Sequence, residues 1–540
     1  MATTTLTGTT GNDILNAPGS VTTLVAGLEG NDTITLALSA DEANAGAGND
    51  SITVAGNIGA KANTINGGSG NDTVFLTSAG VSLFQGSIGL NDGNDLFSNS
   101  ANLQLVGVSI GGNAGNDTIS LRSGVATNVT LGGGQDADSI AVSGTLTNVV
   151  ILGGGGKDTV SFRDPGGVTA TTIQSGDGHD QILATGAIGA ASLVIASGKG
   201  FDSIALGATT VGTVAGGALN DTITYLGSGG GGSIFGDGLG DTVGASDGGA
   251  DLISLTAAGF TAATSIYGAA GGDTIRLGTA QGTAVAVLGG NGADLISGGI
   301  ASAMTGTVAG GDGHDTIAFS NFGSGVTILG EDGIDYLTVN SGGAGSINGG
   351  AGNDSIVFGG LSVATAVGGV ATINGGSGVD TINLGISNVG TTGSIVTGIV
   401  ALGNTGIYGA AVYASGDVLE FGTTAGLSQA NVLATALTVK SLYVISQASL
   451  TNLASGTILA TTTGGTGAAG SVFVYDTNGL GTAGGDLVIG ISDGGCQAQF
   501  FYVTGGDSLI TTTSTGVQTT TVVNMTFANG SVGGMTITLG

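Results

Sequence analysis

The residues best placed to do chemistry are aspartates that close glycine-rich turns at a regular spacing. The clearest turns have the form Gly-Gly-x-Gly-x-Asp, as in GGSGND at Gly67 to Asp72 and GGDGHD at Gly310 to Asp315. Carboxylate oxygens bind hard divalent cations, and glycines allow backbone carbonyl oxygens to converge on the same ion. The pattern therefore predicts a repeated cation site with one aspartate in each repeat.

Most successive turn aspartates are 18 to 23 residues apart. Asp251 also ends a turn, but it follows Asp241 by only 10 residues and is left out of the predicted ligand set. The predicted metal ligands are Asp13, Asp32, Asp50, Asp72, Asp95, Asp117, Asp138, Asp158, Asp180, Asp202, Asp221, Asp241, Asp273, Asp294, Asp315, Asp335, Asp354 and Asp380.

Short alternating segments on both sides of each turn must position these aspartates. TVFL follows Asp72, TISL follows Asp117, and TNVVIL precedes Gly153. Such segments alternate with a period of two and are rich in Val, Ile and Thr, which is typical of strands with one buried face. Each repeat of about 20 residues thus holds two strands, one turn and one variable loop.

A coil of two strands cannot bury its apolar face alone and becomes stable only in a stack. We therefore expect an all-β fold: a right-handed parallel β-roll or β-solenoid over residues 1–385. From Ile386 the motif stops, and a smaller β-rich domain is expected over residues 386–540. Within it, Ser471 to Ile491 predicts a hairpin around a glycine-rich turn.

Stacked turns place one carboxylate per coil in a column. Like charges about 5 Å apart repel by several kcal/mol at an effective dielectric constant near 20, so a cation must neutralise them. Flexible loop carbonyls suit the six to eight oxygen ligands of calcium better than the strict octahedron of magnesium. The alternative is that Gly, Asn and Asp only shape the turn, which explains one isolated copy better than many copies in phase.

The overall composition limits the possible partners. The chain has 540 residues with 7 Lys and Arg against 37 Asp and Glu, which gives a net charge of −30. This charge excludes a basic surface that binds nucleic acid. Only 8% of residues are charged and the mean hydropathy is positive, unlike a disordered acidic tail. No transmembrane helix is expected, and the first residues lack the basic and apolar regions of a cleaved signal peptide.

The turns resemble those of the RTX family of calcium-binding β-rolls, over about residues 5 to 385. The resemblance implies calcium between stacked turns, bound by turn carbonyls and the final aspartate, here Asp72, Asp117, Asp158, Asp180, Asp294, Asp315, Asp335, Asp354 and Asp380. This chain departs from the family's nine-residue period because it has one motif per coil. We therefore expect one calcium column, with variable loops on the opposite edge.

Several turns depart from the motif. Ser197 to Asp202, Gly216 to Asp221 and Gly268 to Asp273 lack a glycine or carry it displaced, and weak or empty sites are expected there. Other turns carry an acidic residue at the third place, which either adds a ligand or only solvates the edge: Glu29, Asp92, Asp177, Asp237, Asp312 and Asp332.

Catalytic signatures are weak. His179 and His314 each precede a turn aspartate and are interpreted as solvated turn residues, because no His-Glu-x-x-His pattern exists. Gly506 to Leu509 matches a hydrolase signature by chance, since no histidine follows it. Cys496 lacks a downstream histidine and is either a packed thiol or an exposed cross-linking one. No catalytic residue is predicted, and the chain is not expected to be an enzyme.

The chain most resembles the self-assembling surface members of the RTX group, S-layer and oscillin-like fibril proteins. The segment Ser471 to Ile491 is also similar to the region after the repeats in proteins exported by type I secretion; a capping domain without an export role is the alternative. Repeats that begin at Gly8 leave no room for a separate N-terminal cap, so copies are expected to meet there.

These observations predict a calcium-dependent, self-assembling extracellular structural protein without a cleaved N-terminal signal peptide. Its expected partners are copies of itself, calcium ions and cell-surface polysaccharide. The alternatives are a secreted calcium-binding adhesin, or an enzyme whose active part lies in residues 386–540, a region with no histidine and little charge.

Overall fold

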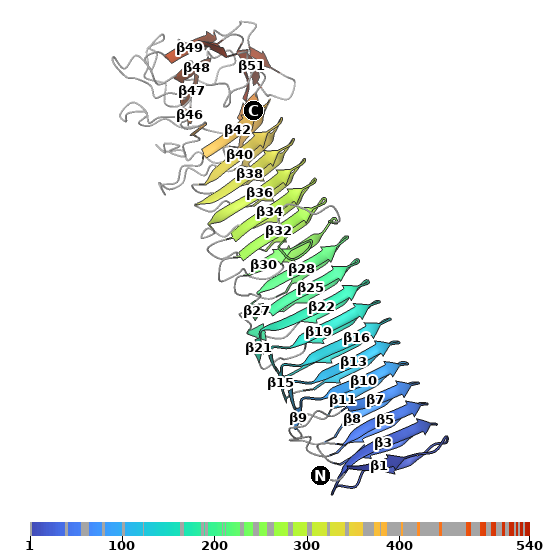
Figure 1. Ribbon diagram of the computed structural model, residues 1–540. Coiled ribbons are helices and arrows are strands. Elements are labelled where there is room, and N and C mark those ends of the chain that lie inside the picture. Colours follow the sequence, from blue (N-terminus) through green and yellow to red (C-terminus); the bar gives the residue numbers. More distant parts are fainter. Residues whose placement is uncertain are drawn as a thin grey trace. The chain divides into compact units, whose positions relative to one another are not determined.

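The computed structural model describes most of the repeats and, after residue 385, short strands only. The described residues before that point are 3–37, 41–55, 64–77, 82–99, 103–122, 124–162, 167–184, 188–189, 193–207, 209–210, 212–226, 232–240, 248–255, 264–278, 285–299, 305–320, 325–340, 345–359, 372–378 and 380–385. Every secondary structure element in the described residues is a strand, which confirms the predicted all-β class (Figure 1). The chain forms two compact units, Met1–Arg276 and Leu277–Gly540.

Unit 1 is a stack of coils in which each strand pairs in parallel with strands of neighbouring coils. Its first sheet consists of β1 (Thr3–Thr7), β3 (Thr22–Glu29), β5 (Glu42–Ala47), β7 (Thr64–Ser69), β10 (Ser87–Asp92), β13 (Ser109–Ala114), β16 (Thr130–Gln135), β19 (Val150–Gly155), β22 (Thr171–Asp177), β25 (Leu193–Lys199), β28 (Thr213–Ala218), β30 (Ser233–Phe235) and β32 (Thr264–Ala270). These strands lie side by side in Figure 1.

The second sheet of unit 1 starts after each turn. It consists of β2 (Ile14–Asn16), β4 (Thr33–Leu36), β6 (Ser51–Val54), β8 (Thr73–Leu76), β11 (Leu96–Asn99), β14 (Thr118–Leu121), β17 (Ser139–Val142), β20 (Thr159–Phe162), β23 (Gln181–Ala184), β26 (Ser203–Leu206), β29 (Thr222–Tyr225), β31 (Leu252–Leu255) and β33 (Thr274–Leu277). The parallel solenoid predicted from the alternating segments is thereby confirmed.

The core lies between the two sheets and follows the alternation of the sequence. In β14 and β17, Ile119 and Ile140 are paired in register and are 0% and 1% exposed, while Thr118 and Ser139 are exposed. Most core side chains are Ile, Val and Leu, with a few buried rings such as Phe162. The narrow core therefore depends on branched side chains that repeat at the same position in each coil.

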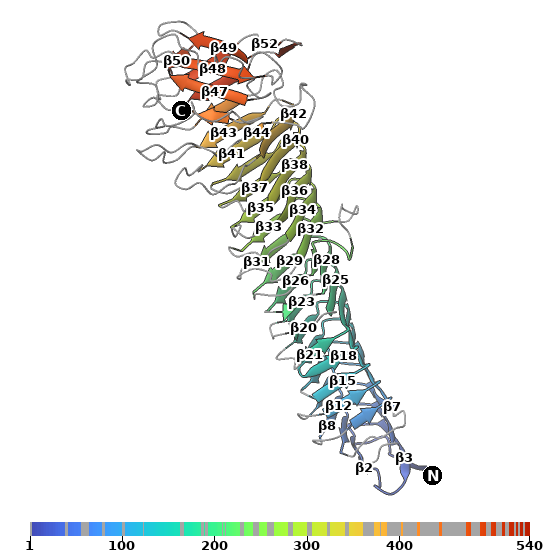
Figure 2. The same cartoon turned by 90° about the vertical axis from the view of Figure 1, so that its left-hand side faces the viewer.

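A third sheet in unit 1 corrects the prediction of two strands per coil. Over residues 82–169 the edge opposite the turns is not a set of loops but the parallel sheet β9 (Ser82–Phe84), β12 (Leu103–Val106), β15 (Gly124–Thr127), β18 (Thr145–Thr147) and β21 (Gly167–Thr169), labelled in part in Figure 2. Asn128 and Asn148 form its corners at φ 53° and 52°, a left-handed conformation that asparagine tolerates. β24 (Ile188–Gly189) and β27 (Thr209–Thr210) also pair in parallel.

Unit 2 contains coils of the same type. Its first sheet has β34 (Val285–Asn291), β36 (Gly306–Asp312), β38 (Val326–Asp332), β40 (Ser346–Ala351), β42 (Thr372–Ser377) and β44 (Ala401–Leu402). Its second sheet has β35 (Leu295–Gly298), β37 (Thr316–Phe319), β39 (Tyr336–Val339), β41 (Ser355–Gly359), β43 (Thr381–Gly385) and β45 (Val418–Phe421).

The remaining strands pair mainly in antiparallel fashion. β47 (Ser471–Asp476) pairs antiparallel with β48 (Leu487–Ser492), which confirms the predicted hairpin, and β48 pairs with β49 (Ala498–Val503). The others are β46 (Leu442–Val444), β50 (Ile510–Thr512), β51 (Gln518–Val522), β52 (Met525–Phe527), β53 (Gly530–Val532) and β54 (Met535–Leu539). The domain boundary at residues 385/386 stays a prediction, and Cys496 and residues 506–509 lie outside the described residues.

Candidate cation-binding column

The turn aspartates form a hydrogen-bonded column along one edge of the coils. The backbone N–H of Asp72 donates to Asp95 Oδ1 at 2.6 Å, and that of Asp138 donates to Asp158 Oδ1 at 2.8 Å. Within each unit the same bond joins successive column aspartates at 2.6–2.9 Å.

The column brings together nearly all the residues predicted as ligands. In unit 1 it contains Asp13, Asp32, Asp50, Asp72, Asp95, Asp117, Asp138, Asp158, Asp180, Asp202, Asp221, Asp251 and Asp273. In unit 2 it contains Asp294, Asp315, Asp335, Asp354 and Asp380. The three turns that depart from the motif, ending at Asp202, Asp221 and Asp273, keep their place in it.

One member of the column was missed by the sequence argument. The N–H of Asp221 donates to Asp251 Oδ1 at 2.7 Å, and the N–H of Asp251 donates to Asp273 Oδ1 at 2.8 Å. Asp251 thus holds the place that the spacing assigned to Asp241, which lies outside the described residues. The pairing of Gly248 with Leu219 marks the register of this turn, and the alternating run LISL after Asp251 is the sequence signal that could have identified it.

The carboxylates are buried although they carry charge. From Asp32 onward the column aspartates are 0–3% exposed. Their second oxygen, Oδ2, is buried without a hydrogen-bond partner in at least these cases: Asp32, Asp50, Asp72, Asp95, Asp117, Asp138, Asp158, Asp221, Asp251, Asp315, Asp335 and Asp354. An unpartnered buried carboxylate oxygen is costly, so the structure needs a proton or a cation at these positions.

In the turns that begin with glycine, Oδ2 lies against that glycine, whereas Ala45 and Leu90 hold this place in the turns that end at Asp50 and Asp95. A Cβ on Gly112 would lie 2.1 Å from Asp117 Oδ2 and 2.4 Å from the carbonyl oxygen of Gly133 in the next coil. On Gly330, a Cβ would lie 2.3 Å from Asp335 Oδ2 and 2.2 Å from the next coil's carbonyl oxygen. Two hydrogen-bond acceptors, the carboxylate and the carbonyl, therefore approach the same small region, which a side chain would fill.

Serine replaces that glycine in two turns, and its hydroxyl shows what the region requires. Ser175 Oγ donates to the carbonyl oxygen of Ser197 in the next coil at 2.9 Å, and Ser197 Oγ donates to the carbonyl oxygen of Gly216. Burial raises the pKa of Asp180, and the Ser175 hydroxyl is among the groups that lower it. In these turns the hydroxyl next to the carboxylate donates to the same carbonyl that the carboxylate faces in glycine turns.

Burial controls the proton affinity of the column. Burial, reinforced by neighbouring carboxylates, raises the pKa of Asp72 and Asp138 to about 7 and that of Asp221 to about 8, although the hydrogen bond from the preceding coil's backbone opposes it. Basic side chains cannot neutralise the column, because the chain has 7 Lys and Arg for 37 acidic residues. Lys199 pairs instead with exposed Asp177, at 3.3 Å between Nζ and Oδ1.

The donor set fits calcium better than a transition metal. No three His, Cys, Asp or Glu side chains among the described residues converge on one point. An ion in the column would therefore take oxygen ligands from one or two carboxylates and from turn carbonyls, which is the ligand chemistry of calcium. A hard cation is the simplest group that satisfies a carboxylate Oδ2 and a facing carbonyl together.

A second, exposed ladder runs beside the column. Asn12, Asn31, Asn49, Asn71 and Asn94 each accept, through Oδ1, the backbone N–H of the corresponding residue in the next coil at 2.8 Å. The two histidines take the same place: His179 Nδ1 accepts the N–H of Phe201 and His314 Nδ1 accepts that of Ile334, both at 2.9 Å. These histidines are exposed, as predicted, but they also bond the coils together.

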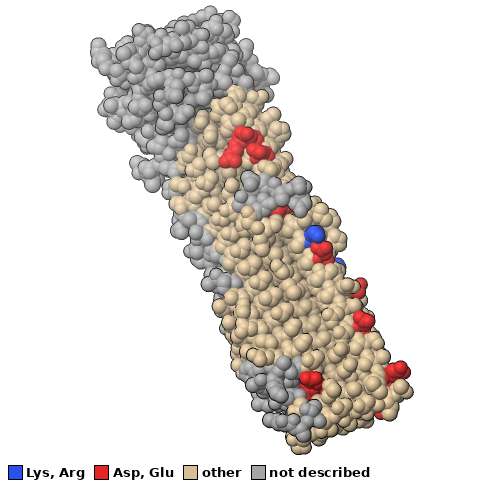
Figure 3. Space-filling model, in the orientation of Figure 1, with Lys and Arg blue, Asp and Glu red and all other residues tan. Residues whose placement is uncertain are grey.

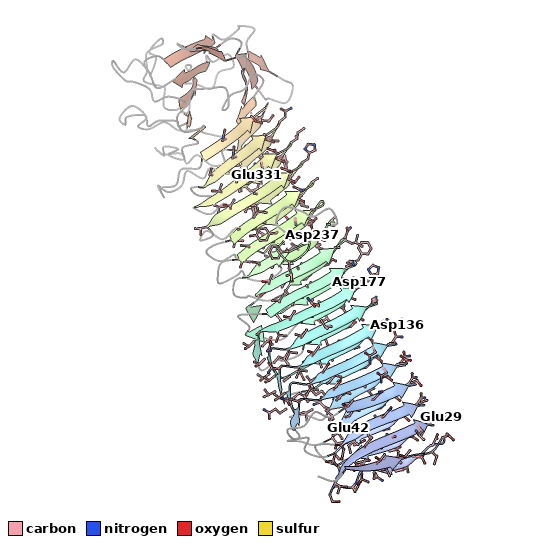
Figure 4. All side chains as sticks on the ribbon, viewed as in Figure 1. Glu29, Glu42, Asp136, Asp177, Asp237 and Glu331 are labelled. Carbon is pink, nitrogen blue, oxygen red and sulfur yellow. The ribbon has the colours of Figure 1, made fainter. Side chains whose placement is uncertain are left out.

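The third-place acidic residues behave in two ways. Glu29, Asp92, Asp177, Asp312 and Asp332 are exposed on the turns and solvate the edge. Asp237 was predicted at the third place but lies at the second place by the register of β28 and β30, and it is 2% exposed. In Figure 4, Glu29 and Asp177 are labelled at the tips of turns.

Comparison with known proteins gave no relative. No protein-family model, no curated protein and no solved structure matched this chain. No helix in the described part of the chain is long and apolar enough to cross a membrane.

Proposed function

We propose that this chain is a calcium-dependent structural protein of the cell exterior, in which calcium binds along the aspartate column and stabilises the stacked coils. The observation that carries the proposal is the row of buried Oδ2 atoms without hydrogen-bond partners, which in the turns that begin with glycine lie close to a carbonyl oxygen of the next coil. Resemblance of the turns to RTX repeats supports the same interpretation.

The column residues would hold calcium between successive coils. In the turns that begin with glycine, the ligands would be Oδ2 of the turn aspartate and the carbonyl oxygen of the first turn residue in the next coil, such as Asp117 Oδ2 with Gly133 O. Bound calcium supplies positive charge that offsets both the desolvation of the carboxylates and their mutual repulsion. Oδ1 is already engaged with the backbone, so it fixes the orientation of each carboxylate.

Calcium concentration would then act as a folding switch. Where calcium is submicromolar, the uncompensated carboxylates disfavour stacking, and the chain stays loose enough for export by type I secretion. Millimolar calcium outside the cell matches the weak affinities typical of extracellular sites and drives stacking by mass action. This coupling is the reason for proposing an extracellular location.

Self-assembly is the proposed role of the stacked coils. Outward-facing residues of the two main sheets are predominantly small and uncharged, as with Ser109, Gly111, Thr118 and Ser120 in successive strands, and Figure 3 shows few charged side chains on the face in view. Uncharged sheet faces let copies of a chain with net charge −30 approach each other without strong repulsion.

Electron microscopy of negatively stained protein tests the assembly. Full-length protein in millimolar calcium is expected to form ordered sheets or filaments, and excess EDTA is expected to disperse them. Assemblies that stay intact after chelation contradict the proposal. Separate, uniform particles in calcium contradict self-assembly and favour the alternative of a calcium-binding adhesin, for which cell-surface polysaccharide is the partner to test.

A further inference from the structure

The step from Asp221 to Asp251 is longer than the other steps of the column in the described residues. Partners elsewhere are 18 to 26 residues apart, but here they are separated by 30 residues. Backbone contacts nevertheless keep this coil in register with its neighbours. Gly236 N donates to the carbonyl oxygen of Tyr267 at 2.8 Å, and Leu219 forms a parallel β-bridge with Gly248. A longer stretch of chain thus reaches the same register.

Asp237 occupies the place of the second turn glycine in this coil. It is 2% exposed, and its two oxygens accept backbone hydrogen bonds on either side: Oδ1 from Gly249 N at 3.2 Å and Oδ2 from Ala270 N at 2.8 Å. Figure 4 labels Asp237 within the region of β28 to β32. Its carboxylate is therefore fixed inside the turn and cannot swing into solvent.

This fixed charge acts on two column carboxylates. Asp237 is among the groups that raise the pKa of Asp221 to about 8 and of Asp251 to about 7, after the larger effect of burial. The Oδ2 atoms of both column residues are buried without a hydrogen-bond partner. A Cβ on Gly236 would lie 2.2 Å from Asp251 Oδ2 and 2.6 Å from the carbonyl oxygen of Gly268, so the same acceptor pair is present here.

We propose that the Asp221–Asp251 step is the tightest calcium site of unit 1, because Asp237 adds a third buried negative charge beside it. The inference rests on the calcium-binding function proposed above. Asp237 is a positioning residue whose charge strengthens the site, and both of its oxygens are already engaged with backbone N–H groups. Calcium affinity rises with the negative charge of a site, and burial reduces the screening of that charge.

A terbium titration of the full-length protein isolates this site. Tb³⁺ is a hard trivalent ion with oxygen preference, and tyrosine sensitises its luminescence; the chain has no tryptophan. Tyr267 pairs in register with Phe235, two residues before Asp237, and stacks on its ring at 4.9 Å. The part of the luminescence lost in Tyr267→Phe reports the Asp237 region, and calcium competition then gives the affinity for calcium.

Asp237→Asn keeps one acceptor oxygen and the shape of the side chain but removes the charge. In this variant, the part of the Tb³⁺ luminescence that depends on Tyr267 is expected to report an apparent affinity about tenfold or more weaker, both for Tb³⁺ and for competing calcium. The matched control, Asp177→Asn, removes an exposed carboxylate of another turn in unit 1. It is expected to leave the affinity measured from the Tyr267-dependent luminescence unchanged.

A purely structural role for Asp237 predicts a different result. Loss of a backbone acceptor would lower the unfolding midpoint equally in EDTA and in saturating calcium, whereas loss of charge reduces the calcium-induced rise of the midpoint. An unchanged affinity in Asp237→Asn, with calcium binding intact in the unsubstituted chain, overturns this inference alone. Absence of any calcium or Tb³⁺ binding by the unsubstituted chain overturns the proposed function itself.

Discussion

Each column aspartate divides its two oxygens between two tasks. Oδ1 accepts the backbone N–H of the preceding coil, as Asp158 does from Asp138, and Oδ2 faces the first turn residue and a carbonyl of the next coil. The repeat predicted which residue type occupies the turn, but not this division, because hydrogen-bond geometry depends on how coils stack. Asp251 was left out because its distance of 10 residues from Asp241 broke the spacing, although the alternating run LISL that follows it marks it as a column member.

The raised pKa values predict an unusual pH dependence of the metal-free protein. The folded-state pKa of Asp72, Asp117 and Asp354 is raised from 3.8 to about 7, chiefly by burial, so the folded form binds more protons than the unfolded chain between about pH 4 and pH 8. Stability in EDTA is therefore highest below about pH 4 and falls as pH rises through 7.

Thermal unfolding in EDTA across this range measures the effect. The unfolding midpoint is expected to be lower at about pH 8 than at about pH 5, and saturating calcium is expected to remove the loss at pH 8 because calcium competes with protons for the carboxylates. A midpoint in EDTA that rises with pH contradicts the burial of ionisable carboxylates.

Exchange of glycine and serine at the first turn position tests the ligand geometry. Ser175→Gly removes the hydroxyl beside Asp180, and calcium stoichiometry is expected to rise by about one ion per chain. Gly153→Ser places a hydroxyl beside Asp158 and is expected to lower it by about one. Calorimetric titration measures both, and Ser109→Gly on an exposed strand position is the control. Unchanged stoichiometry in both exchanges contradicts binding between Oδ2 and the next coil's carbonyl.

Among the elements, the two main sheets were predictable and the third was not. The alternating segments that follow Asp72 and Asp117 carry β-branched residues at a period of two, and they form β8 and β14. The strands of the third sheet have three or four residues and share no common sequence: β12 is Leu-Gln-Leu-Val, β18 is Thr-Leu-Thr and β21 is Gly-Val-Thr. They form because tight corners such as Asn148 bring the same position of successive coils into register.

Glycine at the second turn position of the β19 coil lies against the preceding coil, whereas Leu28, Asn113 and Glu331 hold the same position in other turns at φ 88°, 85° and 78°. Gly154 has φ 118°, and a Cβ there would lie 1.9 Å from the carbonyl oxygen of Gly134. Gly154→Ala is expected to destabilise the protein by about 2 kcal/mol or more. At its neighbour Gly155, an added Cβ would have nothing within 4 Å, so Gly155→Ala is the matched control. Chemical denaturation in calcium compares the two; equal effects contradict the close stacking of turns.

At the scale of the whole molecule, charge and apolar surface are separated within each coil. Most described acidic residues lie in the turns, as the buried column or as exposed third-place residues such as Glu29 and Asp92, while the core holds mainly Ile, Val and Leu. Packing of the core and repulsion in the column therefore oppose each other in every coil. Composition alone predicted the need for cations, but only the stacked coils show that the charge is buried.

Calcium-dependent folding is the most direct test of the account. Full-length protein stripped with EDTA is titrated with calcium at neutral pH while β-structure is followed by circular dichroism and binding by calorimetry, with magnesium titrated in parallel. The account predicts several calcium ions bound per chain, a cooperative gain of β-structure with calcium, and little response to magnesium. A stripped chain that already has full β-structure and binds no calcium would contradict it.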